Sequence, residues 1–325
     1  MRETRIDTRT ISMSLLEAGE GPLVLFCHGF PEGKRAWRHQ VAALAAAGYR
    51  AVAPDMRGYG GSDAPGREDQ YTVVHAVGDM VVLLDALGEA QAAIVGHDWG
   101  ATVAWQAALM RPDRFRAVVA LGVPMMGLPP LPPSRIFPRS EEALFYTLYF
   151  NEPGLADAEL ARDPRRTLLK ILSAASGEAG PRHPGDDTPN PFGMVRRGGG
   201  LLADLPEPAA LPAWLPEAEL DRMAAAFAAS GFTGALNYYR NLDRNFELQQ
   251  AMAGAKVAVP ALFLVGERDT GLSIPGMAEI IAAMPDLVPD LRGSHVIPGA
   301  GHWLQQERPE AVTEALLAFL REVEG

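Results

Sequence analysis

The stretch AAIVGHDWGATVAWQAAL, residues 92–109, decides the fold class. An apolar, β-rich run leads into Gly96 and a helical pattern opens at Trp99, so the pentapeptide GHDWG joins a strand to a helix. A Gly-x-nucleophile-x-Gly junction is a sharp turn that exposes the side chain of its central residue, and the close approach of neighbouring backbone requires the glycines. An aspartate that only caps the helix is the alternative. The flanking glycines favour Asp98 as a nucleophile.

Other strand-like runs lie on both sides of this junction and alternate with helical patterns. Near-continuous apolar runs are typical of parallel strands that are buried on both faces. A helix is expected over residues 74–87, where apolar residues recur at helical spacing and Gly88 follows as a C-cap. The chain is therefore predicted to be an α/β protein with a mostly parallel, doubly wound sheet. Its buried strands are expected to begin at Leu23, Tyr49, Ala92, Phe115, Val259 and Ser294.

This alternation lapses in the middle of the chain, between about Met125 and Gln249, where helical patterns, prolines and glycines occur without a convincing strand. One helix is expected between Pro216 and Gly231, and residues 177–200 have the composition of a mobile loop. A helical insertion above the carboxyl ends of the strands would form a lid. We therefore predict a fold core in two parts, residues 1–125 and 250–325, and a lid over residues 126–249.

Composition bounds the partners of the protein. Of 325 residues, 48% are hydrophobic and 21% charged, which is typical of a globular chain with a sizeable core. The 29 Lys and Arg against 40 Asp and Glu give a net charge of −11, which repels nucleic-acid backbones and anionic membrane surfaces. Residues 117–134 carry no charge, but they contain five prolines, which disfavour a membrane-spanning helix. Neither nucleic acid nor a membrane is an expected partner.

The location and the cofactor content are predicted from what the sequence lacks. The first ten residues are polar and charged and show no apolar signal region. Cys27 is the single cysteine and cannot form an internal disulfide, so a cytoplasmic location is expected. The seven histidines include no H-E-x-x-H pattern, and no cysteine pair is present. We therefore predict chemistry without a metal or other cofactor.

An aspartate in the nucleophile position indicates attack on a saturated carbon. A carboxylate that displaces a leaving group from such a carbon forms an ester whose carbonyl belongs to the enzyme, and water can then hydrolyse this ester. Epoxides and alkyl halides are substrates of this kind. Asp98 is therefore expected to form a covalent intermediate with one of them.

The second step requires a base for water and an acid that orients the base. His302 in GAGHW follows the last predicted strand, where the chain order of this architecture places the histidine. Asp269 at the end of LFLVGERD is the expected orienting acid, although spacing leaves Glu267 open. The oxyanion of ester hydrolysis needs two backbone N–H donors, for which Trp99 and Phe30 in HGFP are the candidates.

Several segments together resemble the epoxide hydrolases of the α/β-hydrolase superfamily, over nearly the whole chain. The resemblance implies two lid tyrosines that donate hydrogen bonds to the epoxide oxygen, at the positions of Tyr146 and Tyr239. The neighbouring Tyr149 and Tyr238 are open alternatives, as is plain packing of the tyrosines in a lid. The segments that carry the resemblance are HGFPEGKRAWRHQ, PDMRGYGGSD, VGHDWG, FYTLYFNEPGLADAEL, GFTGALNYYRNLDRN, VGERD and GAGHW.

The expected substrate is a small lipophilic epoxide that reacts with water to give a vicinal diol. Four aromatic residues are expected to contact it, namely Phe30, Trp99, Phe150 and Trp303, with core or lid packing as the alternative for the last two. The state of oligomerisation is left open between monomer and homodimer.

Two other functions remain as alternatives. A haloalkane dehalogenase shares the Asp-His-Asp chemistry but resembles this chain less, because Phe30 stands where many dehalogenases carry an Asn that donates to the halide. Fluoroacetate-type enzymes carry an Arg after the nucleophile, where this chain has Trp99. A ligand receptor without turnover is the third possibility, which a complete set of Asp98, Asp269 and His302 argues against.

Overall fold

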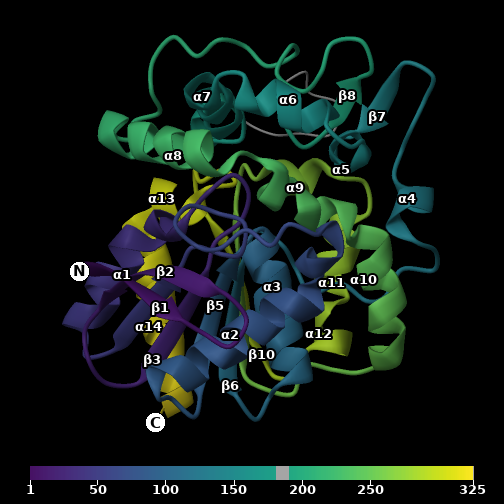
Figure 1. Ribbon diagram of the computed structural model, residues 1–325. Coiled ribbons are helices and arrows are strands. Elements are labelled where there is room, and N and C mark those ends of the chain that lie inside the picture. Colours follow the sequence, from purple (N-terminus) through teal and green to yellow (C-terminus); the bar gives the residue numbers. More distant parts are fainter. Residues whose placement is uncertain (181–189, 325) are drawn as a thin grey trace.

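The computed structural model describes residues 1–180 and 190–324 and has one large sheet with helices on both faces (Figure 1). Eight strands form this sheet in the order β1-β2-β4-β3-β5-β6-β9-β10. The six strands expected from the sequence are β3, β4, β5, β6, β9 and β10, and all of them are parallel to their neighbours in that set. The predicted fold class is confirmed. The strands are β1 (Arg2–Asp7), β2 (Ser12–Ala18), β3 (Leu23–Cys27), β4 (Arg50–Pro54), β5 (Ala92–His97), β6 (Phe115–Leu121), β9 (Ala261–Gly266) and β10 (Leu291–Ile297).

The two edges of the sheet differ from the sequence prediction. Strands β1 and β2 were not expected, and they extend the sheet as an antiparallel pair next to β4. Strand β10 is parallel as predicted, but it is mostly exposed and not buried, and Val296 retains 57% of its surface. The reason is its position at the edge, where only one neighbouring strand and one packed face cover it.

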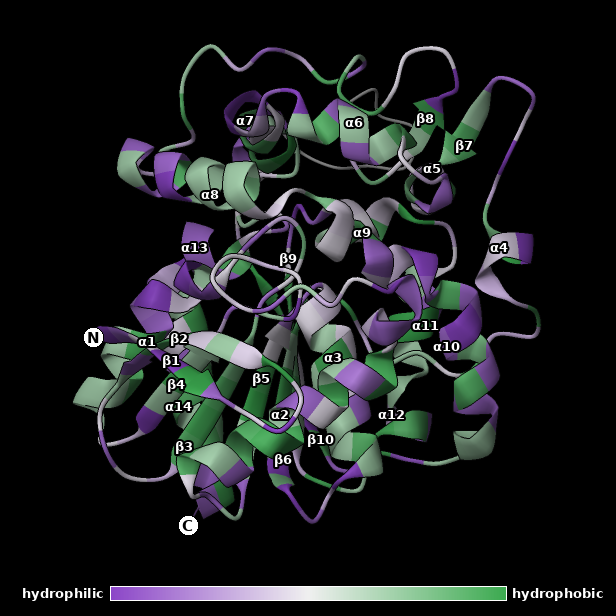
Figure 2. Ribbon diagram, viewed as in Figure 1, coloured by the Kyte–Doolittle hydropathy of each residue, from purple (hydrophilic) through white to green (hydrophobic). Residues whose placement is uncertain are grey.

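Two apolar clusters fill the two faces of the sheet. One contains the inward residues of α2 and α3, and the other contains those of α1 and α14, so the sheet is doubly wound. Figure 2 shows the strands between these layers as hydrophobic over most of their length. Helix α2 has the expected extent and ends at Gly88 in the left-handed conformation. The core helices are α1 (Arg38–Ala46), α2 (Val73–Leu87), α3 (Trp99–Met110), α11 (Met277–Ala282), α12 (Met284–Leu287), α13 (Leu304–Glu307) and α14 (Pro309–Glu324), with short 3-10 helices η1 (Lys34–Trp37), η2 (Glu68–Tyr71) and η5 (Thr270–Ser273).

The chain between β6 and β9 is mainly helical and lies across one end of the sheet in Figure 1. The expected helix between Pro216 and Gly231 is α8, with Leu220 and Phe227 on its buried face. The expectation of no strand is wrong, because two three-residue strands pair here in antiparallel fashion. The elements are α4 (Pro133–Ile136), β7 (Ala143–Phe145), α5 (Tyr146–Asn151), α6 (Leu155–Ala161), α7 (Pro164–Ala174), η3 (Gly177–Ala179), β8 (Met194–Arg196), α8 (Glu217–Ser230), α9 (Thr233–Arg240), α10 (Leu242–Gln249) and η4 (Gln250–Met252).

The loop expected over residues 177–200 is only partly within the described residues, since residues 181–189 lie outside them. Its described ends contain η3 and β8. Among the described residues, no helix is both long and apolar enough to cross a membrane.

Strand order reverses between β3 and β5, since the chain passes from β3 to β4 on one side and then returns to place β5 on the other. In doubly wound sheets the crevice at such a switch point, beyond the carboxyl ends of the strands, is where ligands bind. The loop after β3 carries Phe30, and the turn after β5 carries Asp98. The topology therefore brings these two predicted site residues together.

Candidate active site

The turn from β5 to α3 holds Asp98 in an unusual backbone conformation. Its φ of 52° and ψ of −118° make it the only non-glycine residue with positive φ in the described part of the chain. A β-carbon on Gly96 would lie 2.0 Å from the carbonyl oxygen of Gly100, and one on Gly100 would lie 2.0 Å from that of Cys27. Both glycines are therefore required by close backbone approach. The Asp98 side chain accepts no hydrogen bond from the first turn of α3, so it does not cap the helix.

The backbone on either side of the switch point surrounds the Asp98 carboxylate. The Phe30 amide donates to Asp98 Oδ1 at 2.8 Å. A β-carbon on Gly29 would lie 2.3 Å from Oδ1, so the loop after β3 contacts Asp98 directly. The Trp99 amide begins α3 and, among the described residues, has no hydrogen-bond partner, as is normal for the first amide of a helix. Two backbone donors are thus available on the two sides of this carboxylate.

His302 lies between two carboxylates. Its Nε2 is 3.7 Å from Asp98 Oδ2, and its Nδ1 is 3.0 and 3.1 Å from the two oxygens of Asp269. Asp269 is fully buried after β9 and also accepts from the amide of Gly271 at 2.8 Å. Glu267 is exposed and accepts instead from the amide of Gly299. The structure therefore places Asp269, and not Glu267, against the histidine.

The charges of this group favour an ion pair at rest. Burial alone would raise the pKa of Asp98, but the hydrogen bond and charge of His302 outweigh it and lower the pKa below its ordinary value. Burial alone would lower the pKa of His302, but Asp269 and then Asp98 raise it well above its ordinary value. Both shifts favour the charged forms of Asp98 and His302. Among the described residues, Nε2 of His302 is buried without a hydrogen bond and lies 3.7 Å from Oδ2 of Asp98.

Two of the four candidate tyrosines have hydroxyls without a partner. The rings of Tyr146 on α5 and Tyr239 on α9 lie 5.9 Å apart. The Tyr239 hydroxyl is buried without a hydrogen-bond partner, and the Tyr146 hydroxyl has none among the described residues. Burial, followed by the charge of Asp98, raises the pKa of both. For Tyr239 a polar contact from the Trp99 side chain acts in the opposite direction. Both phenols therefore remain protonated and able to donate.

The other two tyrosines are engaged elsewhere. Tyr149 donates its hydroxyl to Glu159 at 2.7 Å, and Tyr238 donates to the carbonyl of Arg57 at 3.2 Å. Both rings are almost fully buried. Their hydroxyls are thus committed to structural hydrogen bonds.

An aromatic cluster surrounds the Tyr239 ring. Phe150, Trp99 and Phe30 lie with ring centroids 4.9, 5.1 and 5.6 Å from it. Trp303 is less accessible, because it is fully buried and its indole N–H donates to the carbonyl of Leu172 at 2.8 Å. It packs beneath His302 at 4.8 Å. Three of the four predicted contact residues therefore lie around the free tyrosines, while the contact of Trp303 with substrate stays a prediction.

Comparisons with known proteins give this arrangement a family. Residues 22–309 match the family model described as alpha/beta hydrolase fold. The chain is 45% identical to epoxide hydrolase A of Mycobacterium tuberculosis, over 99% of this chain and 98% of that one. It is 40% identical to epoxide hydrolase 2 of Siraitia grosvenorii, over 99% and 98%. The chain belongs to the epoxide hydrolases of the α/β-hydrolase fold family.

Solved structures agree with this assignment. An epoxide hydrolase from an endophytic Streptomyces superimposes with a TM-score of 0.93 at 42% identity, over 99% of this chain and 96% of that one. Epoxide hydrolase A from Mycobacterium thermoresistibile gives 0.88 at 42% identity, over 98% of each chain. The predicted resemblance is confirmed, and these relatives favour neither a dehalogenase nor a receptor.

A pair of buried groups next to His302, namely Glu32 and His97, was not predicted from the sequence. His97 Nδ1 lies 2.7 Å from Glu32 Oε2, with both side chains fully buried, and His97 Nε2 lies 2.8 Å from the carbonyl oxygen of His302. The charge of His97 lowers the pKa of Glu32 against the effect of burial. His97 stands next to Asp98 in the sequence, but its partner could not be read from spacing.

Phe192 was missed as well. Its ring centroid is 5.2 Å from that of His302 and 5.3 Å from that of Tyr146, so it connects the base to one free tyrosine. Phe192 lies in a segment whose composition is that of a loop, and this composition gave no sign of a site.

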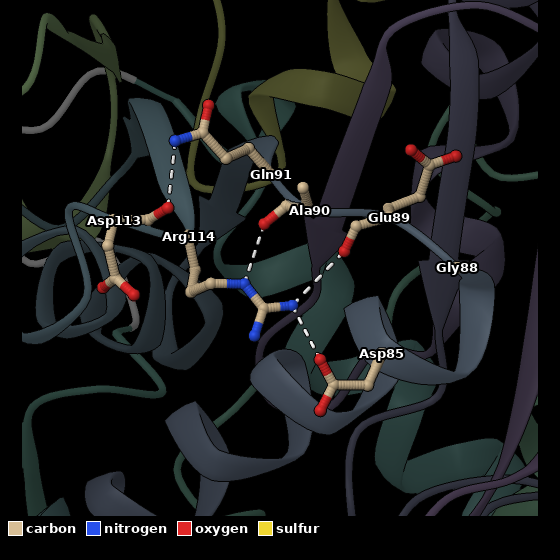
Figure 3. Close-up of a pocket in the computed structure, with 7 residues that line it drawn as sticks. All are labelled: Asp85, Gly88, Glu89, Ala90, Gln91, Asp113 and Arg114. Atoms are coloured by element: carbon tan, nitrogen blue, oxygen red, sulfur yellow. Dashed lines mark hydrogen bonds and ion pairs between the residues drawn. The ribbon is translucent and has the colours of Figure 1, made fainter.

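A shallow pocket lies at the opposite, amino-terminal ends of β5 and β6 (Figure 3). Its guanidinium, on Arg114, is already engaged by Asp85 and by the carbonyls of Glu89 and Ala90. In the parts of the chain that the structure describes, no group of three or more His, Cys, Asp or Glu side chains is arranged to hold a metal ion.

Proposed function

We propose that this protein hydrolyses small lipophilic epoxides to vicinal diols through a covalent ester on Asp98, without a cofactor. The observation that carries the proposal is the grouping of Asp98, a histidine 3.7 Å from it and two tyrosines in one aromatic cluster whose hydroxyls have no partner among the described residues. Family membership supports the same activity.

Ring opening uses Asp98 and the two tyrosines. A carboxylate oxygen of Asp98 attacks a ring carbon, the carbon–oxygen bond of the ring breaks, and its electron pair moves to the epoxide oxygen. Tyr146 and Tyr239 donate hydrogen bonds to this oxygen, and one of them gives up its proton to the developing alkoxide. Without these donors the alkoxide would be a poor leaving group. The products are a hydroxyalkyl ester of Asp98 and one deprotonated tyrosine.

Ester hydrolysis uses His302 and Asp269. Esterification removes the negative charge of Asp98, which is one of the two groups that raise the pKa of His302. The pKa of His302 therefore falls once the ester has formed, His302 gives its proton to the deprotonated tyrosine, and the neutral imidazole can then take a proton from water. Asp269 holds the ring through Nδ1. The resulting hydroxide attacks the carbonyl carbon of Asp98.

The amides of Phe30 and Trp99 stabilise the tetrahedral oxyanion. When this intermediate collapses, the bond between the carbonyl carbon and the alkyl oxygen breaks, and His302 returns its proton to the departing alkoxide of the diol. The carboxylic acid left on Asp98 gives its proton to His302, which restores the starting charges of the site. One epoxide and one water thereby yield one diol.

The chain between β6 and β9 is assigned the role of a lid. Residues 126–249 supply Tyr146, Tyr239 and Phe150, whereas residues 1–125 and 250–325 supply the triad and the amide donors. Phe30, Trp99, Phe150 and Trp303 are proposed to contact the substrate, because aromatic faces favour an apolar substituent on the epoxide. A cytoplasmic location is part of this proposal, in line with the single buried Cys27.

A single-turnover reaction in heavy-oxygen water tests the mechanism. Enzyme in excess over a simple aryl epoxide should give a diol that contains ordinary oxygen, while the heavy isotope enters the peptide that contains Asp98. Halide release from alkyl bromides is assayed alongside. Heavy oxygen in the first diol would exclude the ester, and halide release without diol formation would exclude the substrate class.

A further inference from the structure

The loop that carries His302 is bound to the proposed lid. This base loop, residues 299–303, follows β10, and two of its N–H groups donate to the end of α7. The His302 amide donates to the carbonyl of Ala175 at 2.9 Å, and the Trp303 indole donates to that of Leu172 at 2.8 Å. The base of the second half-reaction is therefore positioned in part by the lid.

Glu307, at the end of α13, joins the same two segments. Its side chain is buried, with 6% of the residue exposed. Oε2 accepts from the amides of Gly177 at 2.8 Å and Gly301 at 3.1 Å and from the hydroxyl of Ser176 at 3.2 Å. Oε1 accepts from the amide of Trp303 at 3.1 Å. Two of the four donors thus come from the base loop and two from the lid.

The two segments touch at the point where Glu307 binds them. A β-carbon on Gly301 would lie 2.2 Å from the amide nitrogen of Gly177, and one on Gly177 would lie 2.4 Å from the carbonyl oxygen of Gly299. Ser176 also accepts from the indole N–H of Trp214 at 3.0 Å, which ties in a further part of the lid. The carboxylate is therefore at the centre of a buried, closely packed joint.

The groups around the Glu307 side chain require a partner that only accepts hydrogen bonds. All four groups that contact the Glu307 carboxylate donate hydrogen bonds to it. An ionised carboxylate carries no proton and can accept all four. A glutamine would turn its NH₂ toward at least one of these N–H or O–H groups and leave that donor unpaired in a buried place, which is unfavourable. Burial raises the pKa of Glu307, while the donors from Gly301, Gly177 and Trp303 act against this rise.

We propose that Glu307 is a positioning residue for His302, which fixes the base loop to residues 175–177 of the lid and so sets the place from which His302 activates water. This inference rests on the proposed function and predicts different effects on its two half-reactions. Since His302 acts as a base only in the second, loosening the joint slows hydrolysis of the Asp98 ester more than its formation. A displacement of a catalytic group by an ångström can reduce a rate by about 10²-fold.

The test follows both half-reactions in Glu307→Gln. Rapid quenching of a single turnover with a simple aryl epoxide, followed by intact-protein mass spectrometry, measures the rise and decay of the ester. We expect decay to slow by about 10- to 10²-fold and the rise to change by less than about 3-fold. In the steady state kcat and KM fall together, because slow hydrolysis lets the ester accumulate.

Two further variants serve as a graded test and as a control. Ser176→Ala removes one donor and leaves three amides on Glu307, so the decay should slow by a smaller factor. Glu267→Gln changes an exposed carboxylate that accepts a single amide, that of Gly299 in the same loop, and should leave both steps as in the wild type. If Glu307→Gln fails to fold, Ser176→Ala alone decides the question.

The outcomes separate this inference from the proposed function. Equal slowing of both steps, or a lower kcat at constant KM, would show a general structural role and overturn it, as would unchanged decay in Ser176→Ala and Glu307→Gln. If no ester is detected even in wild-type protein and in His302→Gln, the proposed function itself fails, and this inference fails with it.

Discussion

The turn that holds Asp98 and the helices that hold the two free tyrosines fix their side chains in different ways. At the turn, backbone lies against backbone, so that no β-carbon fits on Gly96 or Gly100. Tyr146 and Tyr239 instead come from helices α5 and α9, which are far apart in the sequence and pack through aromatic rings 4.9 to 5.9 Å apart. The first arrangement depends on backbone contacts within the turn and with the end of β3, and the second depends on the packing of side chains between helices.

This difference indicates which positions of the enzyme can tolerate substitution. Backbone contact leaves no freedom, because any added atom displaces the main chain. Ring packing can adapt, since side chains of similar volume replace one another at modest cost. We therefore expect changes at the turn to abolish activity and changes among the aromatic residues to give graded effects.

The largest effect should come from Asp98→Asn. Asparagine tolerates a positive φ, so the turn should keep its conformation while the nucleophile is lost. We expect kcat to fall by at least about 10⁴-fold, the order found when one member of a catalytic triad is removed. Diol formation is measured together with thermal unfolding, and intact mass checks that the amide has persisted. Retention of more than a hundredth of the activity would exclude Asp98 as the nucleophile.

His302→Gln should come next and should stop the reaction half-way. Ring opening needs Asp98 and the tyrosines, whereas ester hydrolysis needs the base, so the ester accumulates and turnover falls by about 10²- to 10⁴-fold. Mass spectrometry of the protein after mixing with an aryl epoxide should show a gain of one epoxide mass. Wild-type protein at the same time point is the control, and loss of turnover without any adduct would contradict the assignment of His302.

The variants Tyr146→Phe and Tyr239→Phe test the contribution of the two tyrosines on α5 and α9 to ring opening. Each removes one donor to the epoxide oxygen and keeps the ring, so ring opening should slow by about 10²-fold while the fold stays intact. The pre-steady-state rise of the ester measures this step. The double variant should lose more than either single one, and an unaffected rise in both single variants would remove the tyrosines from the mechanism.

The charge of Asp98 should control the pKa of His302. In the folded protein this pKa is raised, so its contribution to stability is present below the unfolded value, about 6.5, and is lost as the pH rises through the folded value. Asp98→Asn imitates the loss of charge in the ester, and the pKa of His302 should therefore be lower than in the wild type. NMR titration of the imidazole measures it. An unchanged pKa would contradict the account of how His302 becomes a base.

The smallest effect is expected from Tyr149→Phe. Its hydroxyl donates to Glu159, which also accepts from the amides of Leu201 and Leu202 and so keeps two partners in the variant. The free energy of unfolding should fall by about 1 kcal/mol, and ring opening should stay near the wild-type rate. Chemical denaturation measures the first and stopped-flow kinetics the second. A loss of ring opening as large as in Tyr146→Phe would reverse the choice between these tyrosines.

Much of the fold followed from the sequence because its signals are local. The six parallel strands were predicted from short β-rich runs, and helices α2 and α8 from apolar residues at helical spacing followed by Gly88 and Gly231, all of which are properties of a few neighbouring residues. The edge pair β1 and β2 and the short strands β7 and β8 were not predicted. Arg2–Asp7 is mostly polar and exposed, and three-residue strands carry no period, so their pairing depends on partners supplied by the fold.

The features of the site also separate into those that the sequence predicts and those that depend on tertiary structure. The sequence by itself determined the fold class and the position of Asp98, since the glycines around it mark a turn with close backbone approach. Tertiary structure alone decided that Asp269 and not Glu267 faces His302, and that the hydroxyls of Tyr146 and Tyr239 have no partner among the described residues. It alone revealed Glu307. These choices depend on which segments meet in space, and hydrogen bonds between distant segments leave no periodic or local mark in a single sequence.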